Sequence, residues 1–148
     1  MFKPKNILVP IDFTGQSKTA IGEAIDIAKK YGSHIFLLHV IDQQIQQCAD
    51  DYCLTAEEIT SIREEMMKAA KERLDREIAK IKRGRTVKIT GDVRMGDSLH
   101  EILDEEKTRH IDLVVTSPHT GKGLLSWLGL GLAERLVKNS GVETLVVH

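Results

Sequence analysis

Two polar segments hold the residues of this sequence that are best suited to bind a ligand. The first contains Asp12, Thr14 and Ser17, directly after an apolar run that ends at Pro10-Ile11. A carboxylate here can accept hydrogen bonds from a ribose or an amino group, and the hydroxyls can donate to a ligand or cap the next helix. The same spacing is equally typical of a capped turn in which Asp12 has only a structural role.

The second segment runs from Thr116 to Gly131 and is rich in glycine, with Gly121, Gly123, Gly129 and Gly131. Its backbone N–H groups can face an anion, and the helix that follows adds the positive end of its dipole. Long ordered loops in compact domains are often functional. The glycines do not have Walker A spacing, because Gly123 follows Lys122, and no Gly-x-Gly-x-x-Gly follows the first apolar run. The segment therefore predicts an anion site without identifying the ligand.

The elements that position these segments alternate between strands and helices. Apolar runs predict strands at 7–11, 34–41, 86–93, 112–116 and 144–147. Four of them, all but 86–93, are apolar continuously, which is typical of parallel strands covered on both faces. Because the chain alternates strand and helix, we expect right-handed crossovers and a doubly wound α/β sheet. Ligands of such sheets bind beyond the carboxyl ends of the strands, where the strand order reverses.

Apolar residues at three- and four-residue spacing predict four helices. The first has its apolar positions between Ala20 and Ala28 and ends at Gly32; the last covers 132–139. Capping-box patterns begin the second helix at Thr55 and the third at Asp97. Gly84 ends the second and longest helix. A single apolar stripe is predicted along it: Ile59, Ile62, Met66, Ala70, Leu74, Ile78 and Ile81.

Composition limits the function classes. A length of 148 residues predicts one domain, 1–148, and 21 basic against 22 acidic residues give a net charge of −1. This balance argues against broad nucleic-acid binding, and six scattered aromatic residues are too few for a base-stacking platform. Since no secretory or membrane-spanning run is apparent, we expect a cytoplasmic protein. The basic run at 80–88 is interpreted as a solvated helix end, with an RNA or anionic-partner patch as the alternative.

No metal or catalytic constellation has recognisable spacing. Cys48 and Cys53 lack a second ligand pair and are interpreted as incidental thiols. His34 and His39 lie on opposite faces of one predicted strand, so they cannot chelate a metal together. We therefore expect no metal site and no enzymatic activity, although slow ATP hydrolysis stays open.

Motifs along the whole chain resemble the universal stress protein family of the UspA type. The matching segments follow one another in the family's order: Ile7–Thr14, Leu37–Val40, Val93–Asp97, Asp112–Val115 and Thr144–Val147. The resemblance implies a Rossmann-like open five-stranded parallel sheet in the order 3-2-1-4-5, with helices on both faces. It also implies a homodimer that forms through the last strand.

One branch of that family binds ATP and carries Gly-x-x-Gly, nine residues, then Gly-Ser/Thr after the fourth strand. Here Ser117 and Thr120 stand at the first two glycine positions, and Leu130-Gly131 at the last pair. Glycine suits positions where the backbone approaches phosphate closely, so these changes bear directly on binding. The resemblance implies that ATP or AMP is bound, if at all, by these residues: Pro10, Asp12, Val40, Thr116, Ser117, His119, Thr120, Gly131 and Leu132.

Three functions remain open. The first is a cytoplasmic, dimeric stress-response regulator that binds ATP or AMP and acts through an unidentified protein partner. The second is a nucleotide-independent interaction module of the same fold, in which Trp127 and the leucines of the second segment form a docking surface. The third is a weak ATP-hydrolysing or nucleotidyl-transfer enzyme, for which no catalytic base is apparent.

Overall fold

A computed structural model describes residues 1–42, 51–118 and 131–148. The elements follow one another along the chain as β1 (Asn6–Pro10), α1 (Gly15–Tyr31), β2 (His34–Ile41), α3 (Ala56–Lys82), β3 (Lys88–Met95), α4 (Ser98–Thr108), β4 (Leu113–Thr116), α5 (Leu132–Asn139) and β5 (Glu143–Val146).

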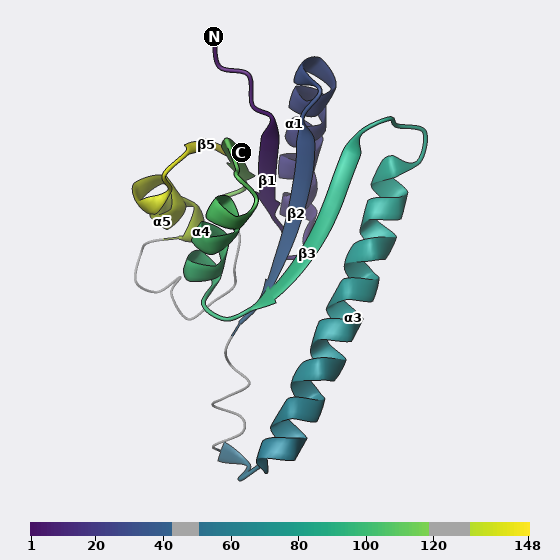
Figure 1. Cartoon of the computed structure of the whole chain (residues 1–148), viewed down its shortest axis with the longest axis vertical. Coiled ribbons are helices and arrows are strands. Elements are labelled where there is room, and N and C mark those ends of the chain that lie inside the picture. Colours follow the sequence, from purple (N-terminus) through teal and green to yellow (C-terminus); the bar gives the residue numbers. More distant parts are fainter. Residues whose placement is uncertain (43–50, 119–130) are drawn as a thin grey trace.

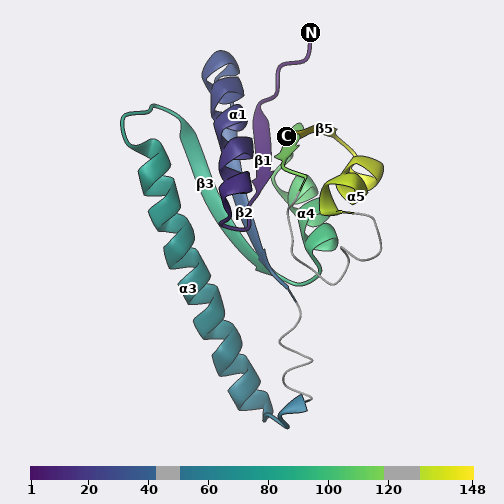
Figure 2. The same ribbon diagram turned by 180° about the vertical axis from the view of Figure 1, so that it is seen from behind.

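The five strands form one sheet in the order β3-β2-β1-β4-β5, and all four pairings are parallel. Helices α1 and α3 lie on one face of this sheet, and α4 and α5 lie on the other (Figures 1 and 2). The predicted fold class and strand order are therefore confirmed. All strands end at one edge of the sheet, the carboxyl edge, where both candidate segments begin.

Each face of the sheet has its own apolar core. Under α1, side chains such as Val9, Ala24 and Leu37 are fully buried, and Leu74 of α3 completes this first core. Under α4 and α5 a second core contains Leu8, Phe36, Leu38, Ile102, Val114 and Leu136. Strands β1 and β4 contribute buried residues to both cores, which explains why their sequences are apolar continuously.

Two predicted boundaries differ from the structure. The third strand is Lys88–Met95 rather than 86–93, because its pairing with β2 continues until Met95 lies opposite Ile41. The capping box of Thr55 is present, with reciprocal 3.2 Å bonds between Thr55 and Glu58. Asp97 caps α4 through the N–H of His100, and the predicted second box is wrong because His100, which is not a Glu or Gln, stands at the N3 position.

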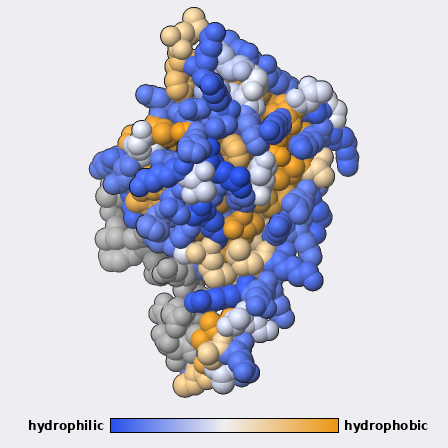
Figure 3. All heavy atoms as spheres, in the orientation of Figure 1, coloured by the Kyte–Doolittle hydropathy of each residue, from blue (hydrophilic) through white to orange (hydrophobic). Residues whose placement is uncertain are grey.

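The predicted apolar stripe of α3 is only partly covered. Leu74 is its one buried residue, whereas Ile62 and Met66 are 37% and 38% exposed. At 27 residues, α3 is roughly 40 Å long, against roughly 27 Å for the eight-residue strands β2 and β3. Its first half therefore projects beyond the carboxyl edge, and hydrophobic atoms are visible there (Figures 1 and 3).

Gly91 sets how closely α3 approaches β3. A Cβ at this position would lie 2.6 Å from Ile78 Cδ1 and 2.9 Å from Leu74 Cγ. We expect Gly91→Val to lower the free energy of unfolding by about 2 kcal/mol through overpacking, measured by urea denaturation. Gly22→Ala is the control: Gly22 lies within α1 with open space around it, so this change should stabilise the protein by about 0.5–1 kcal/mol. An unchanged urea midpoint for Gly91→Val would contradict the packing described.

In the part of the chain that is described, no helix is long and apolar enough to cross a bilayer.

Candidate functional site

The strand order reverses between β1 and β4, and this point organises the candidate site. Pairing of Leu8 with Val114, continued along both strands, brings Pro10 opposite Thr116. Pro10 also lies opposite Leu38 of β2, and the same register carries Asp12 to the level of Val40. The ends of three neighbouring strands thus bring these four predicted residues together at the strand-order reversal, which we call the crevice because open α/β sheets bind ligands in a crevice at this point.

The walls of this crevice are firmly packed. Pro10, Thr116 and Ser117 are buried, and Val40 is partly buried against the second core. Asp12 is half-buried at the opening. Burial of the strand ends fixes the backbone around the crevice, so a ligand would meet a largely preformed surface.

Asp12 organises the turn between β1 and α1. Its Oδ1 accepts hydrogen bonds from the Thr14 N–H at 3.0 Å and from the Ser17 hydroxyl at 2.6 Å. The Thr14 hydroxyl also donates to this oxygen, and the N–H of Asp12 donates to Ser17 Oγ. These are the contacts of the capped turn that the spacing predicted. A ligand-binding role for Asp12 stays a prediction.

Within the described residues, helices α1 and α5 both begin at the crevice without a cap from the side chain of the N-cap residue. Neither Thr14 at α1 nor Gly131 at α5 accepts a cap hydrogen bond through its side chain. By contrast, Thr55 and Asp97 cap the starts of α3 and α4. Since the first N–H groups of a helix have no partner within it, both starts present donors and positive dipole ends. At α1 the Asp12 carboxylate already lies there, accepting from the Thr14 N–H and the Ser17 hydroxyl. The start of α5 therefore suits an anion.

The structure places the remaining predicted site residues as follows. Gly131 begins α5 next to Pro118, whose carbonyl oxygen would lie 3.5 Å from a Cβ added to the glycine. Leu132 is the first residue of α5, and its side chain packs against the second core. His119 and Thr120 lie outside the described residues, as do Lys122 and Trp127.

The histidines and acids of the described part form no metal centre. No group of three or more potential ligands occurs among residues 1–42, 51–118 and 131–148. His34 stacks on Phe36 and bonds with Thr90 on the side of α4. His39 stacks on Phe13 and bonds with the Ile11 carbonyl on the other side. The opposite orientation predicted for the two histidines is confirmed.

An ionic cluster between β3 and α4 was missed by the sequence reasoning. Arg94 of β3 binds Glu101, Asp104 and Glu105 of α4. Arg109, just after α4, binds Asp92 through its Nη2 and Nε at 2.8 and 3.0 Å, and also contacts Glu105. Glu105 has only 2% of its side chain exposed, so two arginines share one buried carboxyl. The cluster fastens α4 to the edge strand of the sheet.

Burial and the two arginines oppose each other in setting the pKa values of this cluster. Burial, together with a hydrogen bond to Asp92, raises the pKa of Glu105. Burial also opposes ionisation of Asp92, but hydrogen bonds with Glu105 and Arg109 outweigh it and lower the pKa of Asp92. The pKa of Asp104 is lowered by its hydrogen bond from Arg94. We regard these shifts as consequences of a structural ion-pair network.

The basic run at 80–88 lies at the end of α3 and the start of β3, opposite the carboxyl edge. Lys80 pairs with Glu77, and Arg85 Nη1 donates to the Ile81 carbonyl near the helix end. Burial, and then the neighbouring charges of Lys88, Arg109 and Lys82, lower the pKa of His34. The contacts of Lys80 and Arg85 suit the solvated-helix-end interpretation, and an anionic partner stays untested.

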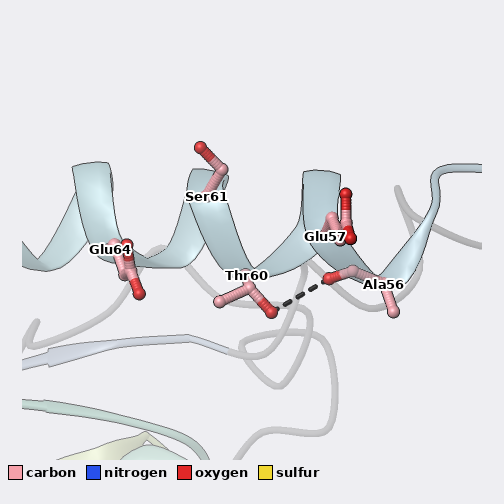
Figure 4. A pocket seen from close by; sticks show the side chains of 5 residues that line it. All are labelled: Ala56, Glu57, Thr60, Ser61 and Glu64. Carbon is pink, nitrogen blue, oxygen red and sulfur yellow. Dashed lines mark hydrogen bonds between the residues drawn. The ribbon is translucent and has the colours of Figure 1, made fainter.

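A surface hollow of about 340 Å³ lies on the first turns of α3, away from the crevice between β1 and β4. Figure 4 shows that all five lining residues come from this one helix: Ala56, Glu57, Thr60, Ser61 and Glu64. The Thr60 hydroxyl is bonded to the Ala56 carbonyl at 2.9 Å. Among the described residues the hollow is lined by two carboxylates and no basic side chain. This lining does not suit an anionic ligand, and the strand-end crevice remains the candidate site.

Comparisons with known proteins identify a family and a fold for this chain. A model described as the universal stress protein family matches residues 3–148. The chain is 29% identical over 144 residues to universal stress protein MJ0531 of Methanocaldococcus jannaschii, covering 97% of this chain and 81% of that one.

Solved structures show the same fold. The hypothetical protein MJ0577 is 21% identical with a TM-score of 0.78, covering 99% of this chain and 96% of its own. The universal stress protein of Archaeoglobus fulgidus in complex with dAMP is 13% identical with a TM-score of 0.65, covering 99% of this chain and 100% of its own.

Proposed function

Since the chain belongs to the universal stress protein family, we propose that residues 1–148 form one cytoplasmic stress-response regulatory domain that binds an adenine nucleotide. The nucleotide occupies the crevice between β1 and β4. Asp12 and Val40 hold the ribose and base, and the N-terminal N–H groups of α5 hold the phosphates, beginning at Gly131.

The observation that carries this proposal is the start of α5 at the strand-order reversal, where the N-cap residue Gly131 has no side chain to cap the helix. Both α1 and α5 start there without side-chain caps, whereas α3 and α4 start elsewhere with caps. An anion at the start of α5 would receive backbone hydrogen bonds and the favourable end of that helix dipole, whereas the start of α1 already faces the Asp12 carboxylate. The dAMP complex of the Archaeoglobus fulgidus relative supports an adenine nucleotide as the ligand class.

Ser117 and Thr120 at the family's glycine positions bear on how tightly phosphate is held. The Ser117 side chain is 2% exposed, so it is accommodated inside the protein directly after β4. A serine or threonine hydroxyl can itself donate a hydrogen bond to a phosphate oxygen. We therefore expect the altered loop to change affinity for the phosphate chain more than recognition of adenosine.

The proposal is tested by looking for bound nucleotide directly. The purified protein is denatured, and the supernatant is separated by anion-exchange chromatography with AMP and ATP standards. In parallel, the thermal midpoint is measured with millimolar AMP and ATP, with GMP for comparison. We expect an adenine nucleotide in the supernatant or a rise in the midpoint with an adenine nucleotide but not GMP. If neither occurs, nucleotide binding is excluded and the interaction-module alternative gains support.

One observation favours an interaction module, but with a docking surface on α3 rather than on Trp127 and the leucines of the second segment, which lie outside the described residues. The first half of α3 projects beyond the sheet and exposes Ile62 and Met66. Such a face suits a protein contact rather than a small ligand. Under this alternative, Ile62→Lys should abolish binding to the physiological partner and leave thermal stability unchanged.

We further propose that the protein is a homodimer through β5. Within the described residues this strand pairs with β4 alone, and Leu145 on β5 and Val137 on nearby α5 are exposed. Adding a second copy along this edge would satisfy its backbone groups. We expect Leu145→Lys to convert a dimer to a monomer in size-exclusion chromatography with light scattering. Ile62→Lys is the matched control: it is equally exposed but lies on α3, so it should stay dimeric. A dimer for both variants would rule out this interface.

A further inference from the structure

Phe13 has an unusual backbone conformation at the edge of the crevice. It directly follows Asp12, and its φ is 62°, in the left-handed region that side chains other than glycine rarely adopt. Such residues persist where their surroundings hold them, and they gather at ligand-binding sites. The surroundings of Phe13 therefore matter for the turn that it belongs to.

The phenyl ring is held on two sides by residues from distant elements. The ring of His39 on β2 lies 4.6 Å from it, centroid to centroid, at an angle of 49°. The guanidinium carbon of Arg73 on α3 lies 4.3 Å from its centroid. His39 is itself fixed through Nδ1, which lies 3.0 Å from the Ile11 carbonyl. The stack of Arg73, Phe13 and His39 thus joins α3, the β1–α1 turn and β2.

Arg73 is well placed to hold this stack. The next residue, Leu74, is buried and packs against Gly91 of β3, so the helix backbone here is anchored to the sheet. Arg73 is exposed and, among the described residues, has no ion pair. Its guanidinium lies over the aromatic face of Phe13, which is a favourable position for a cation.

The stack acts on the crevice through the turn. Phe13 lies between Asp12 and Thr14, whose side chains and N–H groups form the hydrogen bonds that start α1. If the ring shifts, Asp12 and the first N–H groups of α1 shift with it. A small displacement of groups that contact a ligand weakens binding even when the fold is intact.

We propose that Arg73 is a positioning residue for the nucleotide site, holding the Asp12 turn through Phe13. This inference rests on the proposed function. It also means that a residue of α3, outside the two candidate segments, affects ligand binding at the crevice.

The test measures AMP affinity by calorimetry and amide hydrogen exchange of residues 11–17 in the ligand-free protein. We expect Arg73→Ala to weaken AMP binding about two- to fivefold, as the loss of one exposed cation–π contact implies, and to speed exchange in this turn. Arg73→Lys keeps a cation at the ring and should restore both values to within about twofold of wild type. Arg76→Ala removes an exposed arginine from the same helix and should change neither.

Each outcome decides a separate point. If Arg73→Ala and Arg76→Ala bind AMP with the same affinity, the positioning role is wrong. Faster amide exchange of residues 11–17 in Arg73→Ala, without a loss of AMP affinity, would then show that Arg73 stabilises the turn but does not affect binding. If wild type binds no AMP, the proposed function fails together with the nucleotide role. The exchange measurement still decides in that case whether Arg73 holds the turn.

Discussion

Replacing Arg94 with methionine should lower the free energy of unfolding by about 2–3 kcal/mol, the largest stability effect expected for a single residue here. Arg94 is the common partner of Glu101, Asp104 and Glu105, and Glu105 is buried. Removing one partner of a buried ion pair leaves an insufficiently compensated charge. The expected loss is below the usual range for such pairs because Arg109 still contacts Glu105 at 3.3 Å.

The loss of stability in Arg94→Met should be smaller at low pH than at high pH. Burial already raises the pKa of Glu105, and losing the Arg94 hydrogen bond removes an opposing influence, so its pKa rises further in the variant. The folded variant then binds a proton that the unfolded chain releases, and stability falls as pH rises through the folded pKa. Urea unfolding at pH 5.5 and pH 8 should therefore show a smaller deficit relative to wild type at the lower pH.

Two further variants control this experiment. Lys80→Met breaks the exposed pair with Glu77 and should cost less than about 0.5 kcal/mol. Adding Glu105→Leu to Arg94→Met removes the buried charge and should recover much of the loss. If Arg94→Met costs no more than Lys80→Met, the cluster does not fasten α4 to the sheet.

Gly131→Asp should raise the free energy of unfolding and weaken nucleotide binding. Aspartate is among the best residues at a helix N-cap, and the start of α5 has no side-chain cap. The variant should therefore be about 0.5–1 kcal/mol more stable than wild type. The new carboxylate would occupy the N–H groups proposed for phosphate and would repel it. Since two unit charges about 4 Å apart interact by about 4 kcal/mol near a protein surface, AMP affinity should fall at least tenfold.

Gly131→Asn is the matched control, because asparagine caps a helix comparably without a negative charge. It should be about as stable as the aspartate variant and bind AMP better than that variant. A Cβ at this position makes only an ordinary contact with Pro118, so neither change should distort the backbone. Equal AMP affinity for wild type and Gly131→Asp would show that phosphate does not bind at the start of α5.

Most of the fold could be predicted from local sequence pattern. The strand at 34–41 and the helix at 132–139 have the predicted bounds, because the apolar run of the strand and the Ser140-Gly141 exit of the helix are local properties. The placement of Asp12 and Thr116 at one edge could also be predicted, since parallel strands end there together, whereas ligand binding at this place stays a prediction. Family resemblance added the strand order, which the pattern alone does not contain.

What could not be predicted depends on contacts between distant residues. Arg94 and Glu105 are 11 residues apart, and Arg109 and Asp92 are 17 apart, at spacings that also fit solvated charges. Arg73 belongs to an exposed helix face, and nothing local links it to Phe13. The apolar stripe of α3 has regular spacing throughout, and only the length of the sheet determines which half of it is covered.

The central claim is that the crevice between β1 and β4 binds an adenine nucleotide. The most direct measurement is calorimetric titration of AMP into wild-type protein from which any bound nucleotide has been removed, with Gly131→Asp titrated alongside. The account predicts saturable binding with one AMP per chain for wild type and an affinity at least tenfold lower for Gly131→Asp. Absence of binding to a wild-type protein that carries no nucleotide on purification, or equal binding by both proteins, would contradict it.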